Sequence, residues 1–284
     1  MVVFEVSYMT QSNETSFKTF SIISSNRQIL GEGLSHHDDY QQACWVDIIG
    51  DLVTRKNLLT GQEDYFSKFR LPSRTFIDKR RRLFVAHQGG ISLVKSDFSS
   101  SIDCVDWFEK DSEIRCNDGA MDRDGNIWIS TMSILHEPNR ASIWFWNRKS
   151  KPKLIIDDLT IPNSIVLDSE RRRLYFADSQ NNTIYYGILS DRDSRISKIK
   201  EFHKSKVGTP DGSIMDGKGN LWNARWGGSC ILKISPQGNE ELKIMTPFKL
   251  PTSCVLVEQE SSLIVTSAQH EGDSLGGYTI KMRL

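Results

Sequence analysis

Residues 208–228 read GTPDGSIMDGKGNLWNARWGG, and the pattern of this stretch recurs along the chain. It contains an acid, Asp211, then a tight turn rich in Gly and Asn, then a strand-like run that begins at Leu221. Much the same unit occurs earlier, in residues 117–128, which read NDGAMDRDGNIW. A unit that recurs with a polar residue at a fixed phase indicates a repeat architecture with a shared central site.

Short apolar runs rich in Val, Ile, Trp, Tyr and Phe recur throughout, with Gly, Asn, Asp and Ser between them, as is typical of all-β proteins. Alignment of these runs places one large apolar residue at the same point of each: Trp45, Phe84, Trp128, Tyr175, Trp222 and Ile264. Their spacings are 39, 44, 47, 47 and 42 residues. A period of about 40–50 residues is that of a four-stranded propeller blade. The sequence therefore predicts one all-β domain over residues 1–284, a six-bladed β-propeller with four-stranded blades.

A propeller must also close its ring. The C-terminal run GYTIK, residues 277–281, is expected to pair with an N-terminal strand, either near Val2 to Tyr8 or near Phe17 to Ile23. Such pairing would hide the sheet edges. The sequence does not decide which of the two N-terminal runs pairs with the C-terminal strand.

Composition excludes several classes of function. The 284 residues carry zero formal net charge, which argues against nucleic acid or an acidic membrane surface as the main partner. No apolar run approaches the roughly 18 residues needed to span a bilayer, and the N-terminus lacks a signal-peptide pattern. The five scattered cysteines form no Cys-x-x-Cys pair, and most are expected to be buried. These features predict a soluble cytoplasmic protein. We further expect a monomer or weak homodimer whose partner is a small molecule.

Each repeat also places a polar residue near the start of its innermost strand. Counting back 11 to 13 positions from the aligned apolar residues gives Glu32, Ser73, Asn117, Asn163, Asp211 and Ser253. In a propeller the ends of the innermost strands line the central channel, so these residues are expected to converge on one axial site. Ser73 and Ser253 are expected only to line the channel.

Three of these residues have the chemistry of metal ligands. Glu32, Asn163 and Asp211 offer hard oxygen donors, and two carboxylates in a narrow channel repel each other unless a cation lies between them. Oxygen ligands favour calcium, magnesium or manganese. The residues therefore predict one divalent cation, Ca²⁺ as the first choice, with Zn²⁺, Mn²⁺, Mg²⁺ or Fe²⁺ as alternatives because availability often decides which metal is bound.

At these positions the chain resembles the SMP-30/gluconolactonase family of sugar lactonases, also called the regucalcin family. The matching motifs run in family order and include GEG at 31–33, RCNDG at 115–119, PNS at 162–164, LYFADS at 174–179, PDG at 210–212 and WGG at 226–228. The resemblance implies a six-bladed propeller whose divalent cation is held by Glu32, Asn163 and Asp211, with Asp211 also the general base. It further implies that Arg115 and Asn117 contact the oxygens of the substrate.

The chain departs from the family at one substrate position. Members often carry an acid three residues after the Thr131-Met132 pair, to reach a sugar hydroxyl, and this chain has Leu135 there, with His136 and Glu137 following. The resemblance therefore does not identify the sugar.

The first functional hypothesis is hydrolysis of an aldonolactone to the aldonic acid, a carboxylic ester hydrolysis. The cation would polarise the lactone carbonyl, and Asp211 would take a proton from the attacking water. Two alternatives stay open: a phosphotriesterase or fluorophosphatase that uses the same metal, and a calcium-binding regulatory propeller without turnover. The Arg115-x-Asn117 pair favours a polyol substrate. A serine hydrolase is not predicted, because the sequence has no Gly-x-Ser-x-Gly elbow.

Overall fold

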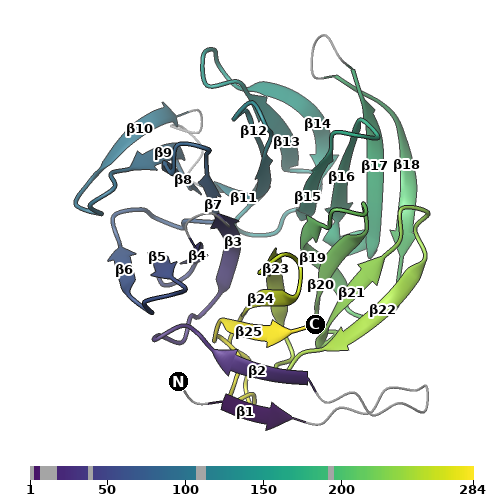
Figure 1. Cartoon of the computed structure of the whole chain (residues 1–284). Helices are drawn as coiled ribbons and strands as arrows, with labels where there is room; N and C mark the ends of the chain where they lie inside the picture. Colours follow the sequence, from purple (N-terminus) through teal and green to yellow (C-terminus); the bar gives the residue numbers. More distant parts are fainter. Residues whose placement is uncertain (1–2, 7–17, 38–40, 107–112, 191–194) are drawn as a thin grey trace.

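The computed structural model describes residues 3–6, 18–37, 41–106, 113–190 and 195–284. These residues form six antiparallel sheets that stand around a common axis (Figure 1). The protein is therefore the six-bladed β-propeller that the repeat predicts. Within the described ranges, no helix is long and apolar enough to cross a membrane.

Five blades each consist of four successive strands that pair as neighbours. The first blade contains β3 (Gly31–His37), β4 (Gln42–Asp47), β5 (Leu52–Asn57) and β6 (Glu63–Phe66), and the second contains β7 (Arg74–Ile77), β8 (Leu83–His87), β9 (Gly90–Val94) and β10 (Ser101–Asp106). The third contains β11 (Ile114–Met121), β12 (Ile127–Ser133), β13 (Ala141–Trp146) and β14 (Lys153–Leu159). The fourth contains β15 (Pro162–Asp168), β16 (Arg173–Asp178), the short 3₁₀ helix η2 (Ser179–Asn181), β17 (Thr183–Leu189) and β18 (Ile196–Lys204). The fifth contains β19 (Thr209–Met215), β20 (Leu221–Trp226), β21 (Cys230–Ile234) and β22 (Glu240–Met245).

The sixth blade closes the ring with strands from both ends of the chain (Figure 1). It contains β23 (Pro251–Val257), β24 (Ser262–Ser267) and β25 (Ile280–Arg283), followed outward by β2 (Lys18–Ile22) and β1 (Val3–Val6). β2 pairs with β25, with Phe20 opposite Met282. Of the two N-terminal runs considered, the one near residues 17–23 therefore pairs with the C-terminal strand. Both side chains of this pair are buried in one apolar cluster, so closure adds hydrophobic contact as well as strand pairing.

The second strand of each blade carries the large core residues that the repeat identified. Those that are buried at the aligned position include Phe84, Trp128, Tyr175, Trp222 and Ile264. Tyr175, for example, packs with Leu221 and Leu232 of the next blade. Four of the five cysteines are also buried, and none forms a disulfide. The apolar core thus lies between adjacent blades.

The first blade differs by one residue from this alignment. Its strand register places Cys44, not Trp45, at the position of Tyr175. Trp45 therefore faces the other side of its sheet and packs on Val255 and Ile264 of the sixth blade. The alignment of the repeats chose the large aromatic residue because it lies directly beside the equivalent core position. Neighbouring residues of a strand point to opposite faces, so a shift of one residue changes the face.

Five inner strands carry a β-bulge near their beginning. The register slips after Glu32 in β3, after Cys116 in β11, after Asn163 in β15, after Pro210 in β19 and after Pro251 in β23. A bulge places two residues opposite one and changes the direction of the local side chains. The bulges therefore recur at the point of the repeat where the polar residues lie.

β7 has no such register slip, which changes the residue that the second blade contributes. Arg74 lies opposite Ala86, as Asn163 lies opposite Ala177. Ser73, the residue found by counting along the sequence, is one position too early. The second blade therefore brings a cation rather than a hydroxyl to this level of the axis.

Candidate active site

A cavity of about 300 Å³ lies at the end of the axis where the inner strands begin. Its polar lining contains Glu32 from β3, Arg115 and Asn117 from β11, Asn163 from β15 and Asp211 from β19. Four blades thus bring together all five residues that the sequence singled out for metal or substrate. The two serines at 73 and 253 are buried elsewhere and do not line this cavity.

Glu32 and Asp211 form a buried pair of carboxyl groups that are hydrogen-bonded to each other. Burial raises the pKa of Glu32 to about 7. Burial, together with the nearby charge of Glu32, raises the pKa of Asp211 well above its usual value. The backbone N–H of Gly33 donates to Glu32 Oε2 at 2.9 Å and acts in the opposite direction on the pKa of Glu32. Without a cation, this pair therefore retains a proton at pH values where an exposed pair would be fully ionised.

A directed relay of hydrogen bonds crosses the other side of the cavity floor. Arg115 Nη1 donates to Asn117 Oδ1 at 2.7 Å, and Asn117 Nδ2 donates to Asn163 Oδ1 at 2.8 Å. Asn163 Nδ2 then donates to Ser179 Oγ at 3.0 Å, and that hydroxyl donates to the carbonyl of Pro210 at 2.6 Å. The relay joins three blades and fixes the direction of both amide groups. Ser179 was not singled out from sequence, although it ends the LYFADS motif.

A second buried acid lies next to the site. Asp118 Oδ1 is 3.6 Å from Arg74 Nε, and Asp118 Oδ2 accepts a hydrogen bond from the Ile165 N–H at 2.9 Å. Burial raises the pKa of Asp118, and the charge of Arg74 opposes this shift. The charge of Arg74 also lowers the pKa of Glu32. The sequence offered one signal for Asp118, its place beside Asn117 in the earlier copy of the repeated unit.

The charges around the axis come from three acids and three arginines. Glu32, Asp118 and Asp211 interact with Arg74 and Arg115, and Arg225 also interacts with Asp211. Burial lowers the pKa of Arg115 to about 10, so its guanidinium stays charged at neutral pH. A divalent cation held by Glu32 and Asp211 would replace the proton that this pair retains, and it suits a site where negative charge develops on a substrate oxygen.

The donor set fits a hard divalent cation. Glu32 and Asp211 supply carboxylate oxygens, and Asn163 Oδ1 accepts one hydrogen bond from Asn117 and keeps a second lone pair. Among the described residues, no cluster of three or more His, Cys, Asp or Glu side chains has a metal-binding arrangement. A protein ligand set of three therefore needs the amide oxygen of Asn163.

The mouth of the cavity carries an imidazole near Leu135, the position where the family resemblance implies an acid. Leu135 is 67% exposed and does not line the cavity, whereas the adjacent His136 does. The backbone N–H of His136 donates to the Ser133 carbonyl at 3.1 Å, and His136 has a positive φ of 58°. Glu137 holds this turn by accepting from Ser133 Oγ at 3.1 Å and by pairing with Arg140.

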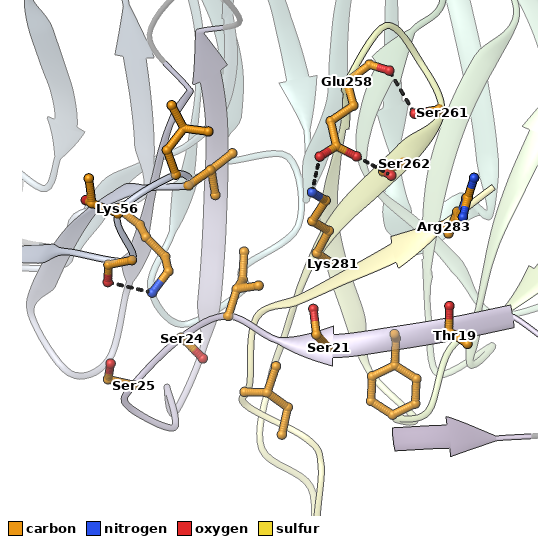
Figure 2. A pocket seen from close by; sticks show the side chains of 17 residues that line it. Thr19, Ser21, Ser24, Ser25, Lys56, Glu258, Ser261, Ser262, Lys281 and Arg283 are labelled. Carbon is orange, nitrogen blue, oxygen red and sulfur yellow. Dashed lines mark hydrogen bonds and ion pairs between the residues drawn. The ribbon is translucent and has the colours of Figure 1, made fainter. Parts of the chain in front are cut away.

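A larger groove, of about 760 Å³, lies where β2 and β25 close the ring (Figure 2). Its acid, Glu258, is paired with Lys281 and accepts a hydrogen bond from Ser262 at 2.8 Å, and these bonds lower the pKa of Glu258. None of the axial residues lines this groove. Size therefore does not identify the candidate site; the buried Glu32–Asp211 pair does.

The raised pKa of Glu32 predicts how the metal-free protein responds to pH. The folded state binds a proton that the unfolded chain has lost between about pH 4.5 and 7. We therefore expect the melting temperature of the metal-free protein to fall by several degrees as the pH rises through this window. Differential scanning calorimetry in a chelating buffer would measure the change.

Glu32→Gln is the matched variant for this measurement, because it removes the titrating group and keeps its size. Its melting temperature should change less than that of the wild type between pH 4.5 and 7. Identical profiles for the two proteins would contradict the assignment of the raised pKa to Glu32.

The fold and the site together define a class of protein, a six-bladed propeller with paired acids and a carboxamide relay at one end of its axis. Residues 30–269 match the model of the SMP-30/Gluconolactonase/LRE-like region. The chain therefore belongs to the SMP-30/gluconolactonase family, as the resemblance of its motifs indicated.

Relatives and a solved structure cover most of the chain. L-arabinolactonase of Azospirillum brasilense is 28% identical over 262 residues, which are 88% of this chain and 84% of that protein. Pentonolactonase XacC of Haloferax volcanii is 26% identical over 253 residues, 87% of this chain and 84% of that protein. The crystal structure of a calcium-binding protein, regucalcin, from Agrobacterium tumefaciens has a TM-score of 0.85 and 25% identity, and the match covers 92% of both chains.

Proposed function

We propose that this protein hydrolyses a sugar lactone to the corresponding aldonic acid. The observation that carries this proposal is the buried Glu32–Asp211 pair beside Arg115 and Asn117 in one cavity of about 300 Å³. A small cavity with a few convergent polar groups and perturbed acids is typical of an active site for a small molecule. Membership of a family that contains sugar lactonases supports the same function.

Glu32, Asn163 and Asp211 are the residues that would hold a divalent cation. When bound, the cation would supply Lewis-acid polarisation of the lactone carbonyl. Ca²⁺ is the first cation to test, because the regucalcin structure is described as that of a calcium-binding protein. Mn²⁺, Mg²⁺, Zn²⁺ and Fe²⁺ are the further candidates.

Asp211 would move the proton in the reaction. A carboxylate oxygen of Asp211 accepts the proton of the attacking water, whose oxygen adds to the lactone carbonyl carbon. The same carboxyl group returns this proton to the ring oxygen when the ring C–O bond breaks.

Arg115 and Asn117 would orient the substrate. Arg115 uses Nη1 for Asn117 and for the Cys116 carbonyl at 2.9 Å, which leaves its other guanidinium N–H groups to face oxygens of the ligand. The relay from Arg115 through Asn117 to Asn163 connects the substrate side of the floor with the proposed cation ligands. Binding in one fixed orientation would bring the carbonyl to Asp211.

A lactone panel tests this function. Purified protein with added cation should acidify solutions of pentono- and hexonolactones faster than the spontaneous reaction, and exhaustive treatment with EDTA should stop the enzymatic part. Adding back Ca²⁺ or Mn²⁺ should restore it. Turnover that survives chelation would contradict the role of the cation.

A second candidate, a calcium-binding propeller without turnover, is favoured by the described calcium binding of the regucalcin structure. The same preparation separates the two functions. A rise in melting temperature with Ca²⁺, without hydrolysis of any lactone, would support the binding protein and contradict the lactonase.

A further inference from the structure

A second ring of side chains lies one step nearer the mouth than the floor of the cavity. In a strand, residues two apart face the same way and are separated by about 6.6 Å. The ring has four members: Leu30, Arg115, Ile161 and Thr209. Each lies two residues before one residue of the floor, which are, in the same order, Glu32, Asn117, Asn163 and Asp211. All four line the cavity, so the ring is polar on the side of Arg115 and apolar at Leu30 and Ile161.

Three more apolar residues extend this surface, and we call the five together the apolar collar: Leu30, Ile48, Met132, Ile161 and Trp226. Leu30, Ile161 and Trp226 are only partly buried and present their surface to the cavity. Ile48 and Met132, 2% and 1% exposed, fill the space behind them. The collar comes from four blades and therefore surrounds much of the mouth.

The hydrogen-bonding groups of the floor are already largely used. Asn117 donates to Asn163 and to the Pro162 carbonyl, and the Ser179 hydroxyl donates to the Pro210 carbonyl. Near the mouth, Arg115, His136 and Thr209 are the polar side chains that line the cavity. A ligand with many hydroxyl groups would therefore place some of them against the collar.

We infer that the preferred substrate is a lactone whose exocyclic end carries a methyl group, as in a 6-deoxyhexonolactone; this inference rests on the proposed function. With the carbonyl at Asp211 and the ring hydroxyls near Arg115 and Asn117, the exocyclic carbons extend toward the mouth and meet the collar. A terminal hydroxyl placed against Leu30 and Ile161 would lose its hydration without gaining a partner. A methyl group at the same place instead buries apolar surface against Leu30 and Ile161.

Matched substrate pairs test this preference with a difference of one oxygen atom. We would compare 6-deoxy-L-mannono-1,4-lactone with L-mannono-1,4-lactone, and 6-deoxy-L-galactono-1,4-lactone with L-galactono-1,4-lactone, in the cation-loaded protein. We expect kcat/KM to be about ten-fold higher for the deoxy member of the preferred pair, which corresponds to about 1.4 kcal/mol. Equal values, or faster hydrolysis of the hydroxylated members, would overturn this inference and leave the proposed function intact. Hydrolysis of none of these or of the wider panel would overturn the proposed function.

Two variants of the collar provide an internal check. Ile161→Thr keeps a β-branched side chain, shortens it by one carbon and adds a hydroxyl, so it should reduce the ten-fold preference several-fold. Leu30→Thr should act in the same direction on the opposite side of the mouth. Ile49→Thr, at an exposed position outside the cavity, is the matched control and should leave the preference unchanged. An unchanged preference in both collar variants would contradict the role of the collar.

Discussion

Replacing Asp211 by Asn is expected to lower kcat/KM for the lactone by about 10³-fold, because it removes the proposed general base and one carboxylate ligand. The same substitution should raise the melting temperature of the metal-free protein by several degrees. Burial and the charge of Glu32 both disfavour an ionised Asp211, and Asn has the same shape without the charge. Loss of activity together with a gain in stability is a pattern that misfolding cannot produce.

Asp216→Asn is the matched control for this result. Asp216 lies in the tight turn that follows β19, where its carboxylate accepts hydrogen bonds from the Asn220 N–H at 2.8 Å and from Trp222 Nε1 at 3.0 Å. Such bonds lower the pKa of Asp216, so its ionised form stabilises the fold at neutral pH. We expect this variant to lose stability and keep its activity. An Asp211→Asn protein that retains a tenth of the wild-type kcat/KM would contradict the catalytic assignment.

Replacing Gly33 by Ala is expected to destabilise the fold by about 3 kcal/mol, a large part of the stability of an ordinary domain. Gly33 has a φ of 62°, and a Cβ atom there would lie 2.3 Å from the carbonyl oxygen of Ser73 and 2.7 Å from the Cα of Arg74. These contacts are with the backbone of the next inner strand and cannot move aside cheaply. Because the Gly33 N–H also holds Glu32, the variant should lose cation binding as well.

Gly61→Ala separates the clash from the backbone conformation. Gly61 has a φ of 78°, but a Cβ atom would meet nothing within 4 Å. The expected cost is therefore that of the left-handed conformation alone, about 1 kcal/mol. Urea unfolding of the two variants and the wild type measures both values. Equal destabilisation by the two substitutions would show that the close approach of β3 and β7 does not matter.

Much of the fold and the candidate site was accessible from sequence because the propeller repeats. Turn residues and a buried apolar residue recur at about 44-residue intervals, so the number of blades and the second strands followed from spacing. The same periodicity found Glu32, Asn117, Asn163 and Asp211, which line one cavity. Their roles as cation ligands, general base and substrate contact remain predictions, whereas their convergence is a property of the structure.

Two assignments made from the repeat spacing were wrong for the same reason. Counting residues assigned Ser73 to the axis and Trp45 to the common core position. The strand register instead places Arg74 at the axis and Cys44 at the core position. One inserted or missing residue moves a side chain to the other face of a sheet, and a bulge leaves no clear mark in the sequence. The sequence also did not predict which side chain of the turn at 135–136 would reach the mouth. The turn conformation places His136 there and leaves Leu135 exposed.

The sequence by itself determined the repeat, the six blades and the kinds of side chain available to the axis, because these depend on local periodicity and residue chemistry. Only the tertiary structure decided which N-terminal strand closes the ring, that Arg74 and Asp118 pair next to the site, and that the mouth carries an apolar collar. These features arise from contacts between residues far apart in the chain. Their geometry is set by strand register and by the close approach of neighbouring blades, which no single segment encodes.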